Sequence, residues 1–250
     1  MVGVKALLLD LDGTLAETEE LHREAFNRAF REAGLPFSWD RPLYKALLEV
    51  TGGKERIAHF LRSFPDAPRL SEEALTRLHQ RKNALYEALL REEGAPLRPG
   101  VRRLLGEARE AGLLLALVTT TSPENARAFL ETSGLKGVFH LVLAGDIVPR
   151  KKPDPAIYHL ARKELGLGEG EGVAVEDSRN GLLSARGAGF PVLITPGFYT
   201  ADQDFSEAQG VAEHLGEPGH PARFLQGPRA GERGVVDLDY LEEVRGWWST

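Results

Sequence analysis

The sequence predicts an α/β fold in which a doubly wound parallel sheet carries an inserted helical domain. Apolar runs alternate with helical patterns between residues 101 and 195, and this alternation is typical of parallel strands with helices on both faces. Residues 17–94, by contrast, carry helical patterns only. We therefore expect a sheet-containing core domain at 1–16 and 95–250 and a helical domain at 17–94.

The first apolar run, at residues 4–10, predicts a buried strand. In the region that follows, Leu21, Ala25 and Phe26 recur at the spacing of one helix face, and Gly34 is a stop signal. Ser71, followed by two glutamates, is a typical helix start. The predicted helices of this region are 19–33, 41–50, 54–63 and 71–93.

Beyond residue 95, strands and helices alternate. Ser122-Pro123 and Asp154-Pro155 are helix starts with proline in the first turn. We expect helices at 101–111, 123–132, 154–165 and 180–188, and strands at 113–119, 139–146, 172–177 and 191–195. Residues 201–234 are rich in glycine, proline and charge and carry no clear pattern, whereas 234–244 predicts a short strand and a final helix.

Composition narrows the class of protein. The 250 residues include no cysteine, which excludes disulfides and thiolate metal sites. No apolar run approaches the roughly 20 residues of a membrane helix, and the first residues lack a signal-peptide pattern. The net charge of −6 gives no support for nucleic-acid binding. We expect a cytoplasmic monomer that binds a small molecule and neither nucleic acid nor membranes.

Polar residues stand at or just beyond the carboxyl ends of four predicted strands. They are Asp10 and Asp12, Thr119 to Thr121, Lys152, and Glu176 with Asp177. The carboxyl ends of parallel strands share one edge of a sheet, where ligands bind. Carboxylates this close together repel one another, so a positive charge is expected beside them. Mg²⁺ fits because it prefers oxygen ligands, and the predicted metal residues are Asp10, Asp12, Glu176 and Asp177.

Phosphoryl transfer is the chemistry that suits these residues. Asp10 can attack phosphorus, and Asp12 can protonate the leaving oxygen and later activate water. Thr119 and Lys152 can hold the phosphoryl group and balance its charge. Each motif alone also has an ordinary structural reading, as a turn, a helix cap or a solvated lysine. Their ordered occurrence on successive strands favours a catalytic site.

These motifs resemble, in order, the four motifs of the haloacid dehalogenase (HAD) superfamily. The resemblance spans roughly residues 4–200, includes DLDGT at 10–14, and implies a Rossmann-like core with a C1-type cap. ELH at 20–22, GKER at 53–56 and RKN at 81–83 resemble the β-phosphoglucomutase-like branch. TGGKERIAHFL at 51–61 and KKPDPAIY at 151–158 are similar to the CbbY group, which implies hydrolysis of xylulose 1,5-bisphosphate to xylulose 5-phosphate through an aspartyl phosphate.

The same resemblance implies a set of substrate-binding residues. They are Glu17, His22, Gly53, Lys54, Arg56, Lys82, Thr120 and Thr121. A second phosphate needs a second anion site, and arginine can bind it with two parallel hydrogen bonds. Lys54 and Arg56 open a helix, where basic residues suit the helix dipole poorly, and this favours a binding role. Without the resemblance, three other residues of this set have an equally good ordinary interpretation. Lys82 is then a solvated lysine, His22 is an ordinary helix histidine, and Glu17 is an acid in the first turn of a helix.

Three other functions stay open from the sequence. A β-phosphoglucomutase-type phosphotransferase would use the same residues with a sugar hydroxyl in place of water. Phosphoglycolate is an alternative substrate for a phosphatase. A non-catalytic sensor could keep this fold, but the intact set of Asp10, Asp12, Thr119, Lys152 and Asp177 argues against that reading.

Overall fold

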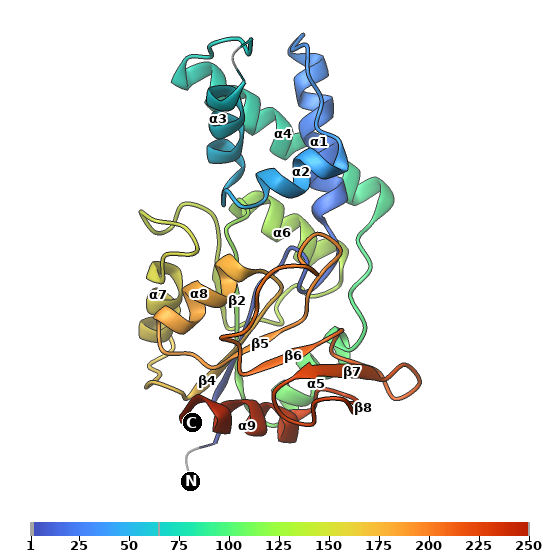
Figure 1. The fold of residues 1–250 in the computed structure, drawn as a ribbon, viewed down its shortest axis with the longest axis vertical. Coiled ribbons are helices and arrows are strands. Elements are labelled where there is room, and N and C mark those ends of the chain that lie inside the picture. The colour runs from blue at the N-terminus through green and yellow to red at the C-terminus, as the bar shows by residue number, and fades with distance from the viewer. Residues whose placement is uncertain (1–2, 65, 250) are drawn as a thin grey trace.

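The computed structural model describes residues 3–64 and 66–249. Figure 1 shows one group of helices gathered at one end of the molecule and the sheet with the remaining helices at the other. Within the described ranges, no helix is long and apolar enough to cross a membrane. The predicted α/β class is confirmed.

One eight-stranded sheet forms the centre of the lower part in Figure 1. Its order is β3-β2-β1-β4-β5-β6-β7-β8, and all pairs from β3 to β6 are parallel. The strands are β1 (Ala6–Leu9), β2 (Leu114–Val118), β3 (Leu141–Leu143), β4 (Gly172–Glu176), β5 (Val192–Ile194), β6 (Gly210–Ala212), β7 (Ala222–Gln226) and β8 (Arg233–Gly234). Because β1 lies between β2 and β4, the motifs that end these three strands become neighbours.

Alternate residues of the strands enter two apolar clusters, one on each face of the sheet. Leu7 and Leu9 pack with α5 (Val101–Glu110), α6 (Pro123–Thr132) and α9 (Leu238–Gly246). Ala6 and Leu8 pack with α7 (Ala156–Glu164) and α8 (Arg179–Gly187). Helices therefore cover both faces, which explains why these strands are continuous apolar runs. A 3-10 turn, η1 (Trp247–Ser249), follows α9.

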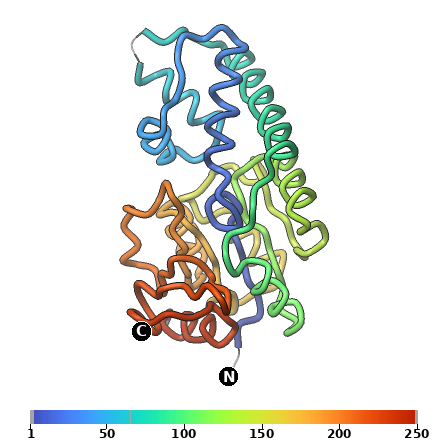
Figure 2. Tube along the Cα trace, turned by 90° about the vertical axis from the view of Figure 1, so that its right-hand side faces the viewer, coloured from blue at the N-terminus to red at the C-terminus, as the bar shows by residue number. Residues whose placement is uncertain are grey.

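The four helices at the other end are α1 (Glu19–Glu32), α2 (Arg41–Leu47), α3 (Gly53–Ser63) and α4 (Glu72–Glu93), called the cap helices below. They enclose an aromatic cluster of their own, in which Phe26, Phe30, Trp39 and Phe60 are almost fully buried. Figure 2 shows α1 and α4 side by side. The two connections to the sheet also lie together, since Ala16 bridges Leu97. The domain bounds at 16/17 and 94/95 stay a prediction.

Most helix ends follow the local signals in the sequence. Ser71, Ser122 and Asp237 each accept a hydrogen bond from the backbone N–H three residues later, at 3.1, 3.2 and 2.8 Å. The structure differs from the predicted elements mainly at 201–234, where β6, β7 and β8 extend the sheet. The short strand expected from residue 234 lies at Arg233–Gly234. These strands have two to five residues and lie in a stretch rich in glycine, proline and charge, which offers no apolar run for a strand prediction.

Candidate active site

Three carboxyl groups meet at the carboxyl ends of β1 and β4. Asp10, Glu176 and Asp177, called the carboxylate cluster below, each place an oxygen within 4.8 Å of the others. Two glycines make room for them. A Cβ at Gly13, whose φ is +79°, would lie 2.3 Å from Asp177 Oδ2, and one at Gly181 would lie 2.0 Å from Glu176 Oε2. The turn after β1 and the start of α8 therefore require glycine to admit these acids.

Lys152 provides the one buried cation in direct contact with the cluster in the described part of the chain. Its Nζ donates to Asp10 Oδ1 at 2.9 Å, to Glu176 Oε1 at 2.5 Å and to the Val118 carbonyl at 2.9 Å. The Tyr158 hydroxyl also donates to Glu176 Oε1, at 2.6 Å. Burial opposes the charge of Lys152, but Asp10 and Glu176 outweigh it and raise the pKa of the lysine. Lys152 is therefore fixed as an ammonium against Asp10.

One ammonium does not balance three acids. Burial and then the charge of Glu176 raise the pKa of Asp10 to about 8, although Lys152 lowers it. Burial and the neighbouring acids also raise the pKa of Asp177 well above its usual value. Glu176 Oε2 is buried and has no hydrogen-bond partner among the described residues. A divalent cation would supply both the missing charge and the missing contact, so this donor set fits such an ion.

The carboxyl group of Asp12 is bound by residues at the start of the cap helices. Its Oδ1 accepts hydrogen bonds from Thr18 Oγ1 at 2.5 Å and from His22 Nε2 at 2.9 Å. Burial alone would raise the pKa of Asp12, but His22 and Thr18 lower it below its usual value. Asp12 is thus ionised in this arrangement and ready to accept a proton. The acids predicted together as metal residues separate here into Asp10, Glu176 and Asp177 on one side and the Asp12 carboxylate on the other.

A buried chain continues from Asp12 into the cap helices. His22 Nδ1 lies 2.8 Å from Lys82 Nζ, and the His22 ring stacks on Tyr86 with centroids 3.9 Å apart. Lys82 Nζ also lies 4.6 Å from the centre of the Phe26 ring. Burial, followed by the charge of Arg56, lowers the pKa of Lys82 to about 7. Lys82 is therefore a buried group rather than the solvated lysine of the ordinary reading.

A cleft of about 990 Å³ separates the cap helices from the sheet edge. Of the predicted site residues, it is lined by Asp10, Asp12, Glu17, His22, Gly53, Lys54, Arg56, Lys82, Thr120, Thr121, Lys152, Glu176 and Asp177. Thr119 is buried beneath this lining, and its Oγ1 accepts a hydrogen bond from the Thr121 N–H at 3.2 Å. The fold thus brings distant parts of the chain to one cavity.

Three of the predicted substrate-binding residues already have polar partners in the protein. Lys54 pairs with Glu72 at 3.1 Å, and Arg56 Nε donates to the Leu47 carbonyl at 3.1 Å. Glu17 lies 3.7 Å from Arg98 Nε, and burial raises its pKa. A Cβ at Gly53 would lie 2.6 Å from His79 Nε2, so this glycine makes room for the histidine. Their roles toward a substrate stay predictions.

Several residues that contact the site are not among the predicted site residues. Tyr158 holds Glu176, and Thr200 Oγ1 lies 3.3 Å from Asp177 Oδ2. The Tyr44 hydroxyl donates a hydrogen bond to Glu19 at 2.6 Å. The Arg56 guanidinium lies over the Tyr44 ring, with Cζ 5.5 Å from the ring centre. Each reaches the site through packing of distant segments, so motif spacing alone does not single it out.

Comparison with known proteins assigns the family. A family model described as haloacid dehalogenase-like hydrolase matches residues 4–189. The chain belongs to this hydrolase family. The superfamily resemblance is confirmed, and with it the expectation of an enzyme.

Within the hydrolase family, proteins named CbbY are close relatives. Protein CbbY of Cereibacter sphaeroides is 44% identical over 219 residues, which are 86% of this chain and 94% of that protein. The CBBY-like protein of Arabidopsis thaliana is 39% identical and is matched over 85% of this chain and 70% of its own length. The predicted likeness to the CbbY group is therefore confirmed.

The solved structures agree with this assignment. A mutant of CbbY from Rhodobacter sphaeroides, in complex with xylulose 1,5-bisphosphate, superposes with a TM-score of 0.82 at 43% identity. The match covers 86% of this chain and 96% of that one. A β-phosphoglucomutase from Clostridium difficile has a TM-score of 0.72 at 21% identity and covers 83% and 90% of the two chains. This second likeness is one of fold.

Proposed function

We propose that this hydrolase is a Mg²⁺-dependent phosphatase that removes the 1-phosphate of xylulose 1,5-bisphosphate through an aspartyl phosphate on Asp10. One observation carries the proposal. The carboxylate cluster, with Lys152 fixed 2.9 Å from Asp10, opens into a cleft whose opposite wall holds Lys54, Arg56 and Lys82. The likeness to CbbY with xylulose bisphosphate bound supports the choice of substrate.

In the first step, an Asp10 carboxylate oxygen forms a bond to phosphorus and the bond from phosphorus to the sugar oxygen breaks. Lys152 compensates the charge on the phosphoryl oxygens. Asp12, which is ionised in the arrangement described above, takes up a proton from solvent as the substrate binds and gives that proton to the leaving oxygen. In the second step, water attacks the phosphorus of the aspartyl phosphate and Asp12 takes a proton from that water. Inorganic phosphate leaves and Asp10 is restored.

The residues that would hold Mg²⁺ are Asp10, Glu176 and Asp177. When bound, the ion supplies positive charge that favours ionised Asp10 and neutralises phosphate oxygens. The cap helices contribute differently: His22 and Thr18 orient Asp12, and the cations of the cleft wall suit the second phosphate. Closure of the cleft around substrate would limit the access of water.

Phosphate release by purified protein tests the proposal. With Mg²⁺, we expect xylulose 1,5-bisphosphate to be preferred over ribulose 1,5-bisphosphate, fructose 1,6-bisphosphate, β-glucose 1-phosphate and phosphoglycolate, with product sugars identified alongside. D10N should fold and release no phosphate, because it lacks the nucleophile. Turnover by D10N would refute the nucleophile, and glucose 6-phosphate formed without free phosphate would identify a mutase.

A further inference from the structure

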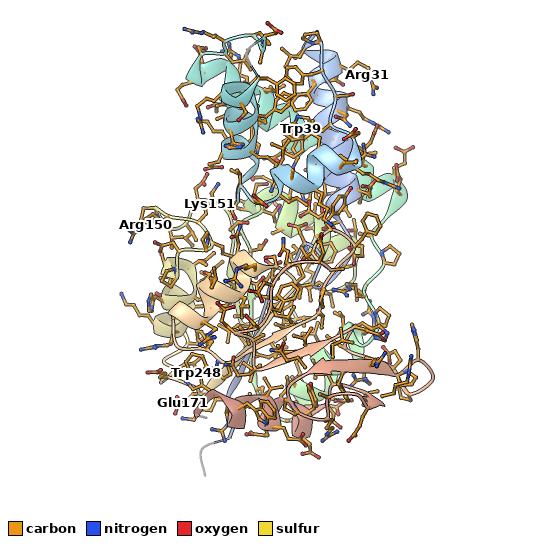
Figure 3. The ribbon with its side chains drawn as sticks, in the orientation of Figure 1. Arg31, Trp39, Arg150, Lys151, Glu171 and Trp248 are labelled. Atoms are coloured by element: carbon orange, nitrogen blue, oxygen red, sulfur yellow. The ribbon has the colours of Figure 1, made fainter. Side chains whose placement is uncertain are left out.

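A second charged cluster crosses the cleft, away from the carboxylate cluster. Lys151 Nζ lies 3.0 Å from Glu55 Oε1 and 2.9 Å from Asp146 Oδ1. The Lys151 side chain is 15% exposed, whereas those of Glu55 and Asp146 are 46% and 85% exposed. In Figure 3, Lys151 lies close to the cap helices and the neighbouring Arg150 lies at the outer side of its loop. Lys151 therefore joins two parts of the protein that the cleft separates.

The two partners of Lys151 differ in origin. Asp146 belongs to the same loop after β3, and the hydrogen bond from Lys151 lowers the pKa of Asp146. Glu55 belongs to the first turn of α3, among the cap helices. The pair with Asp146 can persist whatever the position of the cap helices, but the pair with Glu55 exists only when α3 approaches the loop. Asp146 thus holds the Lys151 ammonium in the position at which it can pair with Glu55.

Residues 49–56 receive a second contact from the core side. Asn180 Nδ2, in α8, donates to the Glu49 carbonyl at 3.0 Å and to Thr51 Oγ1 at 3.1 Å. A Cβ at Gly52, whose φ is +96°, would lie 2.7 Å from Lys151 Nζ, so the backbone passes directly beside the lysine. Lys151 lies in the loop between β3 and α7, next to Lys152, and Asn180 lies in the first turn of α8, shortly after Asp177. Both contacts therefore come from segments that also carry site residues.

We propose that Lys151 is a positioning residue that holds residues 49–56, and with them Lys54 and Arg56, over the carboxylate cluster by pairing with Glu55. The expected effect of Lys151 on catalysis rests on the proposed function, whereas its effect on the position of residues 49–56 does not. Charge explains why lysine is needed: without it, the carboxylates of Glu55 and Asp146 face each other and repel. Removing Lys151 should therefore disturb the cleft more than removing the charge of Glu55.

A distance measurement tests the geometry without any assay of activity. Because the sequence has no cysteine, two introduced cysteines, R31C in α1 and K163C in α7, are the only residues that react with the spin label. Arg31 and Lys163 are both exposed. In this doubly labelled protein we expect K151M to broaden the distance distribution and shift it to longer values. R150M is the matched control, because Arg150 is 76% exposed and pairs with Asp154 of its own loop. Unchanged distributions in K151M would overturn the proposal even if the protein is an active phosphatase.

Kinetics then ask whether Lys151 acts through Glu55. We expect K151M to raise KM by about three- to tenfold with a smaller change in kcat, as for a partly buried ion pair. Adding E55Q to K151M should recover part of this loss, since it removes one of the two repelling carboxylates. Additive losses in the double variant would mean that Lys151 touches substrate directly, and the positioning role would be wrong. Absence of phosphatase activity in all forms would refute the proposed function and leave the distance test valid.

Discussion

His22 Nε2 lies 2.9 Å from Asp12 Oδ1, so a histidine of the first cap helix contacts a carboxyl group at the sheet edge. The two residues are separated by the connection into the cap helices, and their contact depends on the position of α1. Thr18 Oγ1 accompanies His22 on the same carboxylate oxygen. The proposed acid–base group is thus oriented by residues outside the sheet.

We expect H22Q to lower kcat by about tenfold, because Asp12 loses a partner that fixes its orientation. KM for the bisphosphate should change less. H59Q is the matched control, since His59 is an exposed histidine of the cap helices. Steady-state kinetics check the expectation, and equal kcat values in H22Q and the wild type would contradict it.

Arg56 should contribute to recognition of the second phosphate. We expect R56A to raise KM for xylulose 1,5-bisphosphate by about tenfold or more, because a charge-assisted hydrogen bond is lost. KM for a small monophosphate should stay nearly constant. R62A tests the general effect of removing an arginine from α3, since Arg62 is exposed. An equal rise in KM for both substrates would argue against a phosphate-binding role.

The position of these residues shows how far the sequence alone could lead. Asp10, Thr119 and Glu176 stand at or just beyond strand ends, and a parallel sheet makes such ends neighbours, so their meeting was predictable. Lys152 joins them from well along the loop that follows β3. The orientation of each side chain was not predictable. Asp12 is two residues from Asp10, yet its carboxylate is bound by cap residues rather than by the cluster. Two side chains that follow one strand can face different parts of a cleft, and spacing does not record which.

Partners that depend on tertiary packing were equally hidden. Tyr158 contacts Glu176 because α7 packs beside α8 on the face of the sheet that Ala6, Leu8 and Ala174 form. Lys82 is buried by the aromatic rings of Phe26 and Tyr86, although the residues next to it in the sequence are polar and suggest a solvent-exposed position. The missed strands β6 and β7 lie in a stretch rich in glycine, proline and charge, and they are held by pairing with β5, with β8 and with each other. Local pattern therefore predicted β3 and β5, which are equally short but apolar, and left β6 and β7 out.

Cation binding should be visible in thermal stability. We expect Mg²⁺ at about 100 times its Kd to raise Tm by roughly 5–10 °C, since a ligand that binds only the folded state stabilises it by about 2.7 kcal/mol. D177N should lose most of this shift because it removes one acid of the carboxylate cluster. D66N serves as the control, because Asp66 is exposed and remote from that cluster. Differential scanning calorimetry with and without EDTA measures the effect; the same shift in D177N and D66N would place the cation elsewhere.

Lys82 should make stability depend on pH in the alkaline range. Burial and Arg56 lower its pKa to about 7 in the folded protein, whereas an unfolded lysine titrates near 10.4. Between these values the unfolded chain binds more protons than the folded one, so the contribution of Lys82 to the free energy of unfolding rises with pH. Below pH 7 the buried ammonium destabilises the folded state in full.

The K82M variant tests this pH dependence because it removes the ammonium group. The Tm of K82M relative to that of the wild type should be higher at pH 6 than at pH 9. R81M is the neighbouring control, since Arg81 is 53% exposed and pairs with Glu32. A Tm difference between K82M and wild type that stays constant from pH 6 to pH 9 would show that Lys82 keeps an ordinary pKa, and the buried chain from Asp12 through His22 would then end in a permanently charged lysine.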